Sequence, residues 1–518
     1  MLADAQRLVE LLELSHPDPY TPVGGKVAFR RSAAALMRSL PTGDTEPSQF
    51  RDLLDGFLAQ LSDGHTHMER EAVSWYAPPD ALPLDFDVTE DGLHVLAADI
   101  PEMKGTRGYR VLGVAGISID ELAKRWARLS PAENRFHAYA QLRRVLTSPT
   151  LIARLVPGAA SAGQVSLDLL SPVGKRETRT MSIHSGKSAA DHAKWIEPAV
   201  RVTDVPAKDD PFFFGFIRTD TVAYLRVATI MGREAYEMAF RQGWGDPHAM
   251  IDGYYSRKGQ TAPADVEAAL AGIPSFLETT DALLEEMKKR RTQTLVIDLQ
   301  GNGGGVTPMV LPFLQQMYGD AYYAHDFPME FVTVFSQLYL DKFHKDLSAL
   351  RAERSNPELR LGDYGFEAKE EGTAETRRKK ALEEYAAKKM SFAARLEALK
   401  GQPLYTPANV VVLCDEGTFS AAFHFLFFLR ELGASVVGVA PGQAPNTFME
   451  VTEFTLPNSR LKGSISNSAQ IWLADPRAQT LVPDVVLTYD LAKQYRFATD
   501  AVLQLAVDRI AAGTLRKR

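Results

Sequence analysis

The sequence predicts a mixed α/β protein, and three observations lead to this class. Short apolar runs rich in β-branched residues recur at 294–299, 410–413 and 435–439, as is typical of buried parallel strands. A helix-like segment stands between the last two runs and ends at Gly433, a natural helix stop. Glycine-containing bends follow the first two runs. Strand, bend and helix therefore alternate, as in a parallel sheet covered by helices.

Composition excludes several classes of protein. The 518 residues, 45% of them hydrophobic, are too many for one core and predict more than one domain. The net charge of −7 is spread along the chain, so we expect no nucleic-acid partner. The single cysteine, Cys414, excludes an intrachain disulfide. No apolar window is long enough for a membrane span and no signal peptide is recognisable, which leaves the compartment open.

The first segment, 1–75, is predicted to be a helical cap. Leucines recur at near-helical spacing from Leu8 to Leu14, and a clearer apolar stripe runs from Phe50 to Leu61. The second helix breaks at Gly64, which leaves His65 and His67 in a loop or at the start of a strand. Two surface histidines are the plainer interpretation. A zinc site is disfavoured, because no third ligand follows at a suitable spacing.

The segment 76–190 is predicted to be a small β-rich domain. Its expected strands are 84–88, 93–97, 110–114, 165–170 and 178–183. The stretch 108–119, followed by a helix-like run at 120–129, resembles the strand, turn and helix of PDZ domains. Such a domain binds an extended peptide along a sheet edge, although a purely structural role fits equally well.

The remainder, 210–518, carries the α/β alternation. Further predicted elements are a strand at 221–227, a helix at 276–291, a β-hairpin formed by 447–456 and 461–466, and a terminal helix at 490–510. Dense charge interrupts the pattern at about 330–400, which predicts a solvated helical insertion. The insertion is either a lid over the site or ordinary surface.

Ser420 is the candidate nucleophile. It follows the strand at 410–413 and the bend Asp415–Phe419, and it stands at the mouth of a helix. A helix N-terminus offers unpaired N–H groups to a developing oxyanion, and the amide of Ala421 is the nearest donor. The competing interpretation is that Ser420 merely caps the helix, the commonest role of a serine there.

A second group of donors is expected after the strand 294–299. The run Gly301-Asn302-Gly303-Gly304-Gly305 is too glycine-rich for an ordinary turn and indicates close approach of the backbone to a ligand. Phosphate binding is disfavoured, because the Walker lysine and the G-x-G-x-x-G spacing are absent. We expect Gly303 and Gly304 to aim their amides at a carbonyl oxygen, with a flexible turn as the alternative.

Three blocks in this order, Asp63–Thr66, Leu295–Gly305 and Thr418–Ala422, resemble the tail-specific or C-terminal processing peptidase family. The later stretches Glu453–Ser459 and Val482–Asp484 look like further landmarks of that family. The resemblance implies a crotonase-like (ClpP/crotonase) α/β core, a PDZ-like domain, and serine endopeptidase activity without cofactor or metal. The expected partner is a peptide or protein substrate, and a homo-oligomer is left open.

The resemblance also indicates how the serine is activated. One branch uses a lysine downstream of the serine, where this chain reads Pro441–Pro445, and a carboxylate where it has Phe423. The chain therefore resembles the other branch, that of the tricorn core protease, in which an upstream histidine is the base. His65 matches that position. A neutral imidazole with a pKa of about 6.5 can take the serine proton.

The resemblance further implies a carboxylate downstream of the serine that orients the histidine. Asp484 is the first choice, with Asp475 and Glu416 as poorer candidates, and capping of a turn is the alternative role of Asp484. Two other functions compete with the peptidase. One is an acyl-CoA enzyme of the crotonase type, and the other is a catalytically inactive peptide-binding scaffold.

Overall fold

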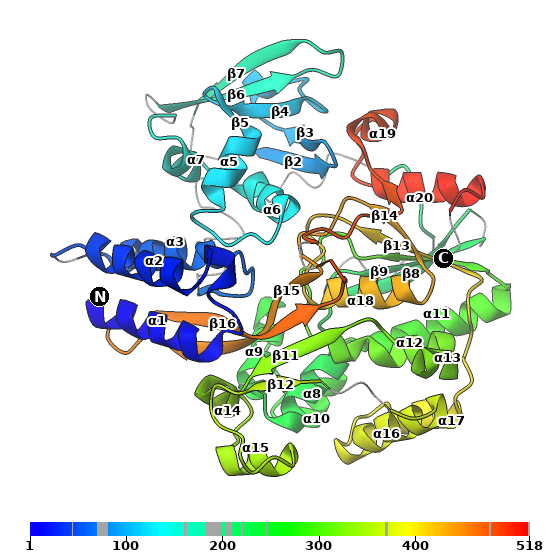
Figure 1. Ribbon diagram of the computed structural model, residues 1–518. Helices are drawn as coiled ribbons and strands as arrows, with labels where there is room; N and C mark the ends of the chain where they lie inside the picture. The colour runs from blue at the N-terminus through cyan, green and yellow to red at the C-terminus, as the bar shows by residue number, and fades with distance from the viewer. Residues whose placement is uncertain are drawn as a thin grey trace.

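Three β-sheets and the helices around them make up the computed structural model (Figure 1). The structure describes residues 1–43, 45–69, 81–159, 163–182, 198–203, 210–218, 221–244, 246–367, 371–475 and 478–515. The predicted mixed α/β class is confirmed. Within the described ranges, no helix is both long and apolar enough to span a membrane.

The sheet that carries the nucleophile turn has six strands in the order β17-β14-β13-β10-β9-β8. All neighbours are parallel except β8 and β9. The strands are β8 (Phe212–Ile217), β9 (Val222–Val227), β10 (Thr294–Asp298), β13 (Asn409–Cys414), β14 (Ser435–Gly438) and β17 (Val485–Val486). The three apolar runs in the sequence are thus β10, β13 and β14, which lie side by side and are buried throughout but for one end residue of β13.

Helices cover both faces of this sheet, which explains why its strands are apolar rather than alternating. One face packs against α11 (Phe276–Arg290), α12 (Leu311–Tyr318) and α18 (Ala421–Glu431). The other face packs against α20 (Ala501–Ala511) and shares its core with the β-rich domain. The remaining helices near this core are α8 (Arg233–Gln242), α9 (Pro247–Arg257), α10 (Val266–Ala271), α13 (Asp320–Ala324) and α19 (Tyr489–Gln494).

The β-rich domain forms the separate cyan block at the top of Figure 1. Its strands are β2 (Leu84–Thr89), β3 (Gly92–Ala98), β4 (Arg110–Val114), β5 (Ile117–Ser118), β6 (Gln164–Leu170) and β7 (Arg176–Ser182), as predicted apart from the short β5. Its helices are α5 (Ile119–Trp126), α6 (Arg135–Val145) and α7 (Pro149–Leu155). Residue 183, the expected end of β7, and both predicted domain limits, near 75 and 190, lie outside the described residues.

The N-terminal segment consists of helices, as predicted: α1 (Leu2–Ser15), α2 (Lys26–Ser39) and α3 (Pro47–Leu58). Their buried faces pack on a third sheet, made of β1 (His67–Met68), β11 (Glu330–Val334), β12 (Tyr364–Phe366), β15 (Asn446–Thr455) and β16 (Lys462–Ile471). Leu14, expected in the apolar stripe, is exposed instead. The predicted hairpin is β15–β16, and β16 also pairs with β1, which fixes the segment that follows His65.

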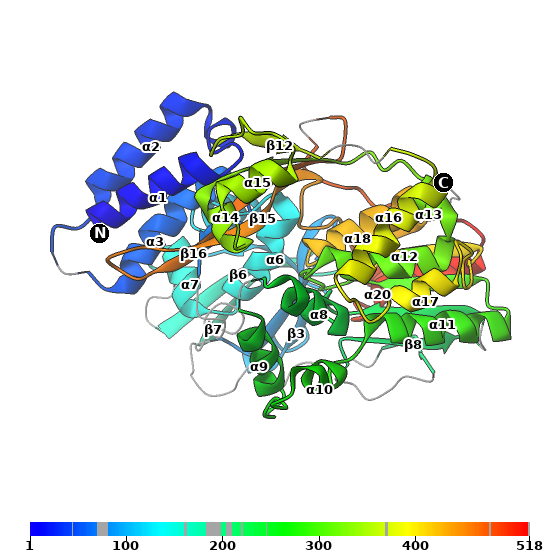
Figure 2. The same ribbon diagram turned by 90° about the horizontal axis from the view of Figure 1, so that it is seen from below.

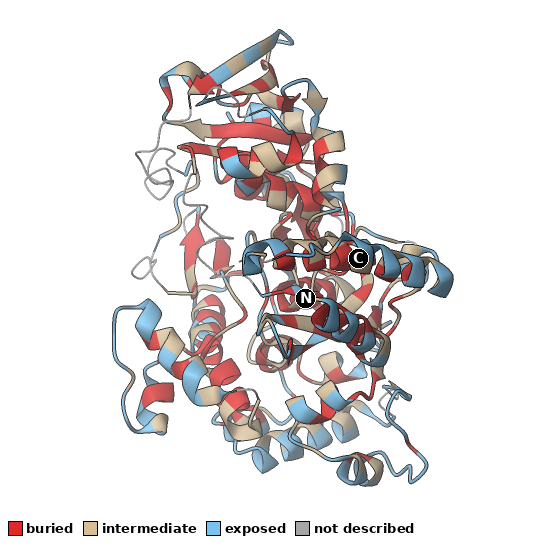
Figure 3. Cartoon of the chain, turned by 90° about the vertical axis from the view of Figure 1, so that its left-hand side faces the viewer, coloured by how far each residue is buried: buried red, intermediate tan, exposed pale blue. Residues whose placement is uncertain are grey.

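The interval 330–400 is not the purely helical excursion that its charge predicted. It contains α14 (Gln337–Lys342), α15 (Leu347–Glu353), α16 (Ala374–Ala387) and α17 (Ala393–Ala398), but also β11 and β12. Strand β11 pairs with β16 inside the third sheet. Figure 2 shows α16 and α17 lying over α12 and α13. Most residues of α16 are exposed, and exposed positions lie on the outer surfaces of helices across the molecule (Figure 3).

Candidate active site

The carboxyl ends of β10 and β13 are neighbours in a parallel sheet, so the loops that follow them meet, as ligand-binding loops do in open α/β sheets. The amide of Phe419 donates to the carbonyl of Asn302 at 3.0 Å. The amide of Gly301 donates to Asp415 Oδ1 at 2.8 Å. These bonds join the glycine loop to the nucleophile turn.

Ser420 begins α18 but does not cap it. Its side chain makes no cap hydrogen bond, and its backbone has φ 54° and ψ −128°, which a residue with a Cβ rarely adopts. The amide of Ser420 donates to the buried side-chain oxygen Oε1 of Gln443. The capping interpretation of this serine is therefore wrong, and its hydroxyl is left available for chemistry.

His65 lies within hydrogen-bond distance of that hydroxyl: its Nε2 is 3.2 Å from Ser420 Oγ. The imidazole stacks on the ring of Phe419, with centroids 4.9 Å apart and planes at 27°. The hydroxyl of Ser464, on β16, donates to the carbonyl of His65 at 2.7 Å. Strand pairing and stacking together hold the histidine against the nucleophile turn.

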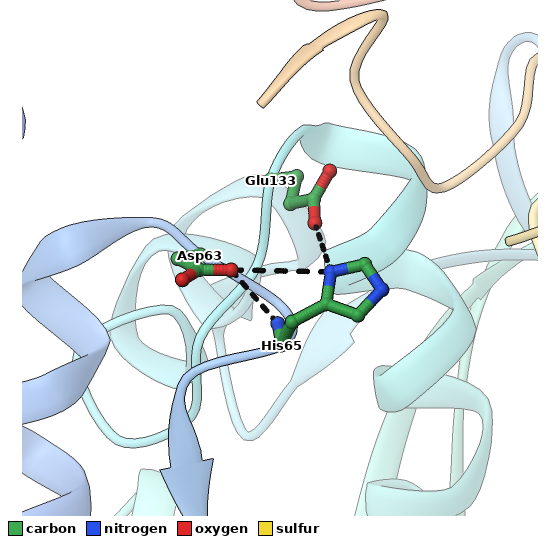
Figure 4. A group of neighbouring side chains, drawn as sticks. All are labelled: Asp63, His65 and Glu133. Atoms are coloured by element: carbon green, nitrogen blue, oxygen red, sulfur yellow. Dashed lines mark hydrogen bonds and ion pairs between the residues drawn. The ribbon is translucent and has the colours of Figure 1, made fainter. Parts of the chain in front are cut away.

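Two buried carboxylates face the other ring nitrogen of His65 (Figure 4). Glu133 Oε1 is 3.6 Å from Nδ1, and Asp63 Oδ1 is 4.0 Å away. Glu133 lies in the β-rich domain immediately before α6. Sequence reasoning missed Glu133, because it belongs to none of the matching blocks and it precedes Asn134, an ordinary helix-capping residue.

The carboxylate expected from the resemblance is elsewhere. Asp484 directly precedes β17, and its Oδ2 accepts a hydrogen bond from the amide of Val436 in β14, so it ties two strands together. Asp484 as the partner of His65 is therefore wrong. Glu416 pairs with Arg143 instead, and Asp475 is exposed. His67 is exposed as well, on the strand that leads away from the site.

Asp63 is fixed by its own network. Its Oδ1 accepts from the amide of His65 at 2.9 Å, and its Oδ2 is 3.2 Å from Nε2 of buried His16. The amide of Asp18 donates to His16 Nδ1, which assigns the ring proton to Nε2 and makes His16 the donor to Asp63. Burial alone would raise the pKa of Asp63, but the hydrogen bond from His16 holds it well below its usual range.

The electrostatics favour the charged form of His65. Burial lowers the pKa of His65, yet the contact with Glu133 and the charges of Glu133, Asp63 and Glu450 outweigh it and raise the pKa. Burial raises the pKa of Glu133, and the histidine only partly offsets this. A proton that arrives on His65 is therefore stabilised by the carboxylates behind the ring.

The glycine loop differs in one respect from its prediction. The amide of Gly304 donates to Asn302 Oδ1 at 2.9 Å and is thus not a free oxyanion donor. Gly304 has a steric role instead, because a Cβ on it would lie 2.6 Å from Ser420 Cβ. Among the described residues, the amides of Gly303 and Ala421 have no hydrogen-bond partner, so both are open as donors beside Ser420.

The same cluster meets one geometric condition for a metal site. One ligand atom each from Asp63, His65 and Glu133 lie within 4.8 Å of one another. Two of these oxygens already accept backbone hydrogen bonds, Asp63 Oδ1 from His65 N and Glu133 Oε1 from Gly64 N. The two carboxylates also stabilise the protonated form of His65.

Comparison with known proteins gives the fold. No family model and no curated protein sequence matches the chain. Mature CPAF complexed with lactacystin aligns with 99% of this chain and 98% of its own, with a TM-score of 0.59 and 15% identity. A second structure of mature CPAF covers 98% of this chain and 95% of its own, with a TM-score of 0.58 and 15% identity.

The photosystem II D1 C-terminal processing protease aligns with 95% of this chain and 94% of its own, but its TM-score of 0.39, at 12% identity, is too low to carry an argument. The resemblance to CPAF, by contrast, covers all three sheets. This chain has the fold of mature CPAF along almost its whole length.

Proposed function

We propose that this protein is a serine endopeptidase of the tail-specific type, which cleaves peptides or partly unfolded proteins through an acyl-enzyme. The observation that carries the proposal is the 3.2 Å contact between His65 Nε2 and Ser420 Oγ. A serine that caps no helix and contacts an imidazole has the geometry of an activated nucleophile. The fold shared with CPAF supports the same function.

The reaction begins when Ser420 Oγ attacks the carbonyl carbon of the scissile bond and passes its proton to His65 Nε2. The carbonyl oxygen becomes an oxyanion that accepts hydrogen bonds from the amides of Gly303 and Ala421. His65 then gives the proton to the leaving amine, and the C–N bond breaks. Water hydrolyses the ester by the same route, which restores the Ser420 hydroxyl and releases the carboxylic acid.

The finer features of the fold belong to this proposal. We assign 210–518 to a crotonase-like core, 76–190 to a PDZ-like domain and 1–75 to a helical cap. The chain order β10, glycine loop, β13, nucleophile turn and α18 supports the assignment of a crotonase-like core. The resemblance to the tricorn core stays a prediction.

The two competing functions explain fewer of the contacts. An acyl-CoA enzyme of the crotonase type uses the oxyanion donors but has no need of a histidine against Ser420. An inactive scaffold has no need of the unusual backbone conformation of this serine, which costs about 1–3 kcal/mol. Both alternatives predict that Ser420 is unreactive, and this difference is measurable.

The test is covalent labelling with a fluorophosphonate, followed by mapping of the modified residue. We expect the label on Ser420, and we expect Ser420→Ala to abolish both labelling and peptide hydrolysis. His65→Ala should reduce the rate of peptide hydrolysis by a comparable factor. The double variant Ser420→Ala/His65→Ala should be little slower than either single variant, because the two residues act as one unit. His67→Ala should retain most activity.

Ser118→Ala is the matched control, since Ser118 does cap a helix, accepting the amide of Glu121. It should label normally and lose only about 1 kcal/mol of stability. Lactacystin, which is bound in the CPAF structure, is a second probe, and prior incubation should protect Ser420 from the label. Normal hydrolysis by Ser420→Ala would overturn the proposal.

A further inference from the structure

The catalytic histidine is held between two parts of the molecule that are far apart in sequence. His65 follows the N-terminal helices, whereas Glu133 belongs to the β-rich domain. We infer that Glu133 is the positioning residue for His65, and that the β-rich domain thereby supplies a working part of the active site. This inference rests on the proposed peptidase function.

Both oxygens of Glu133 are fixed by backbone donors. Oε1 accepts from the amide of Gly64 at 3.2 Å, and Oε2 accepts from the amide of Ala444 at 2.9 Å. Gly64 adjoins His65, and Ala444 adjoins Gln443, which binds the amide of Ser420. The carboxylate therefore links the segment of the base to the loop that supports the nucleophile.

Close packing leaves the carboxylate little freedom to move. Glu133 is buried, and a Cβ on Gly64 would lie 3.0 Å from Glu133 Oε1 and 2.7 Å from the ring of Phe419. The amide of Glu133 is also 3.4 Å from His137 Nδ1, one turn along. A carboxylate immobilised in this way can select one tautomer and one orientation of the imidazole.

Asp63 is the competing candidate for this role, and its geometry is poorer. Asp63 Oδ1 is 4.0 Å from Nδ1, against 3.6 Å for Glu133 Oε1, and each of these oxygens accepts one backbone amide, so the shorter distance favours Glu133. The other oxygen of Asp63 is bound by a second imidazole, that of His16, whereas the Glu133 carboxylate pairs with the imidazole of His65. Asp63 therefore shapes the loop around His65, and Glu133 accepts the Nδ1–H when the base becomes charged. The 3.6 Å contact needs only to tighten in the substrate complex.

Docking of the β-rich domain adds bonds beside Glu133. Asn134 Nδ2 donates to the carbonyls of Pro441 and Gln479, at 3.0 Å each. The backbone of Gly442 packs on His137, since a Cβ there would lie 3.3 Å from His137 Cα. Residues 133–137 thus place the carboxylate relative to the core as well as within their own domain.

The experiment compares Glu133→Gln with the wild-type chain. The amide keeps the size of the side chain but not the charge, so we expect kcat for peptide hydrolysis and the rate of fluorophosphonate labelling to fall by about 10²–10⁴-fold, with KM little changed. The acid limb of the pH profile should also move to lower pH. Activity requires neutral His65, and losing the carboxylate that favours its charged form lowers its pKa. A residue that only supported the fold would not move that limb.

Glu121→Gln is the matched control, because Glu121 lies in the same domain and pairs with Arg125 at the surface; it should behave as wild type. Glu133→Asp keeps the charge on a shorter side chain, so its rate of peptide hydrolysis should lie between those of the wild type and Glu133→Gln. This variant replaces Glu133→Gln in the test if Glu133→Gln does not fold. A wild-type rate and unshifted profile in Glu133→Gln, or a wild-type rate in Glu133→Asp, would overturn the inference. If Ser420→Ala and His65→Ala were also fully active, the proposed function itself would fall.

Discussion

Ser420 combines backbone strain with a contact to an imidazole, as expected of a nucleophile. Its φ of 54° points the side chain away from the helix that follows, which is why the hydroxyl reaches His65 instead of the amides of α18. Such a conformation persists only when its surroundings impose it. Here Gln443 binds the amide of Ser420, and the backbone of Gly304 packs directly against its Cβ.

This contact makes the site sensitive to a single methyl group. Gly304→Ala would place a Cβ 2.6 Å from Ser420 Cβ and 2.9 Å from the amide of Ala421, at a φ of +105°. We expect kcat to fall by about 10²-fold or more, since a displacement of about 1 Å at a reacting group has that effect. Steady-state kinetics beside a thermal melt would separate misplacement from unfolding.

Gly174→Ala is the control for backbone strain alone, because Gly174 has a φ of +86° with nothing within 4 Å of an added Cβ. It should lose some stability without losing activity. Equal kcat values for Gly304→Ala and the wild type would show that the nucleophile tolerates displacement.

At the scale of elements, the charged interval 330–400 makes more buried contacts with the core than its composition predicted. Its end packs Met390, Phe392 and Leu396 against Met238 and Leu277 of the core. Buried Glu237 accepts the amide of Ser391 at 2.9 Å and its hydroxyl at 2.8 Å. A run dense in lysine and glutamate thus covers an apolar surface with a few well-placed residues.

A merely solvated insertion could be removed without harm to the core, but the packing of its end predicts a different result for deletion of Lys342–Lys400. The deletion would expose Met238 and Leu277 and remove both hydrogen bonds of Ser391 to Glu237, so we expect aggregation or a Tm lowered by many degrees. Lys379→Ala, which alters an exposed i,i+4 pair with Glu375, is the control and should melt as wild type. A soluble deletion variant with an unchanged Tm would restore the original expectation.

At the scale of the whole molecule, the sequence predicted local elements well and distant contacts poorly. The strands of the parallel sheet are buried on both faces and therefore appear in the sequence as continuous apolar runs. The strands of the hairpin were likewise recognisable from their apolar residues. The pattern of strand, bend and helix pointed to Ser420, whereas the choice of His65 as the base followed from the resemblance. Glu133 left no local signal, because its role exists only after a separate domain docks on the core.

The hydrogen bond that occupies the Gly304 amide also could not be predicted, because it forms only in the folded loop. The side chain of Asn302 turns back on its own loop, and no residue pattern shows that it will. Strand β11 escaped prediction because it is half exposed and lies within a charged interval, so it lacks the apolar run of a core strand. Contacts made by side chains across domains and loops are what the sequence could not supply.

One ion pair couples the β-rich domain to the nucleophile turn. Arg143 on α6 donates to Glu416 at 2.6 Å, and it also lies 3.7 Å from Asp85 and 3.8 Å from Asp87 within its own domain. The Glu416 side chain is only 2% exposed. A buried carboxylate without its partner costs about 3–5 kcal/mol, so this pair ties the docking of the domain to the stability of the turn.

Arg143→Met should therefore lower the Tm and slow the labelling of Ser420, because it leaves Glu416 buried and uncompensated. Adding Glu416→Gln should recover much of the Tm and of the labelling rate, since the neutral amide no longer needs a cation. The recovery should be incomplete, because Asp85 and Asp87 also lose the charge of Arg143. Arg125→Met, which breaks a surface pair in the same domain, should change neither quantity. A double variant whose losses are the sum of the single ones would mean that Arg143 and Glu416 act independently.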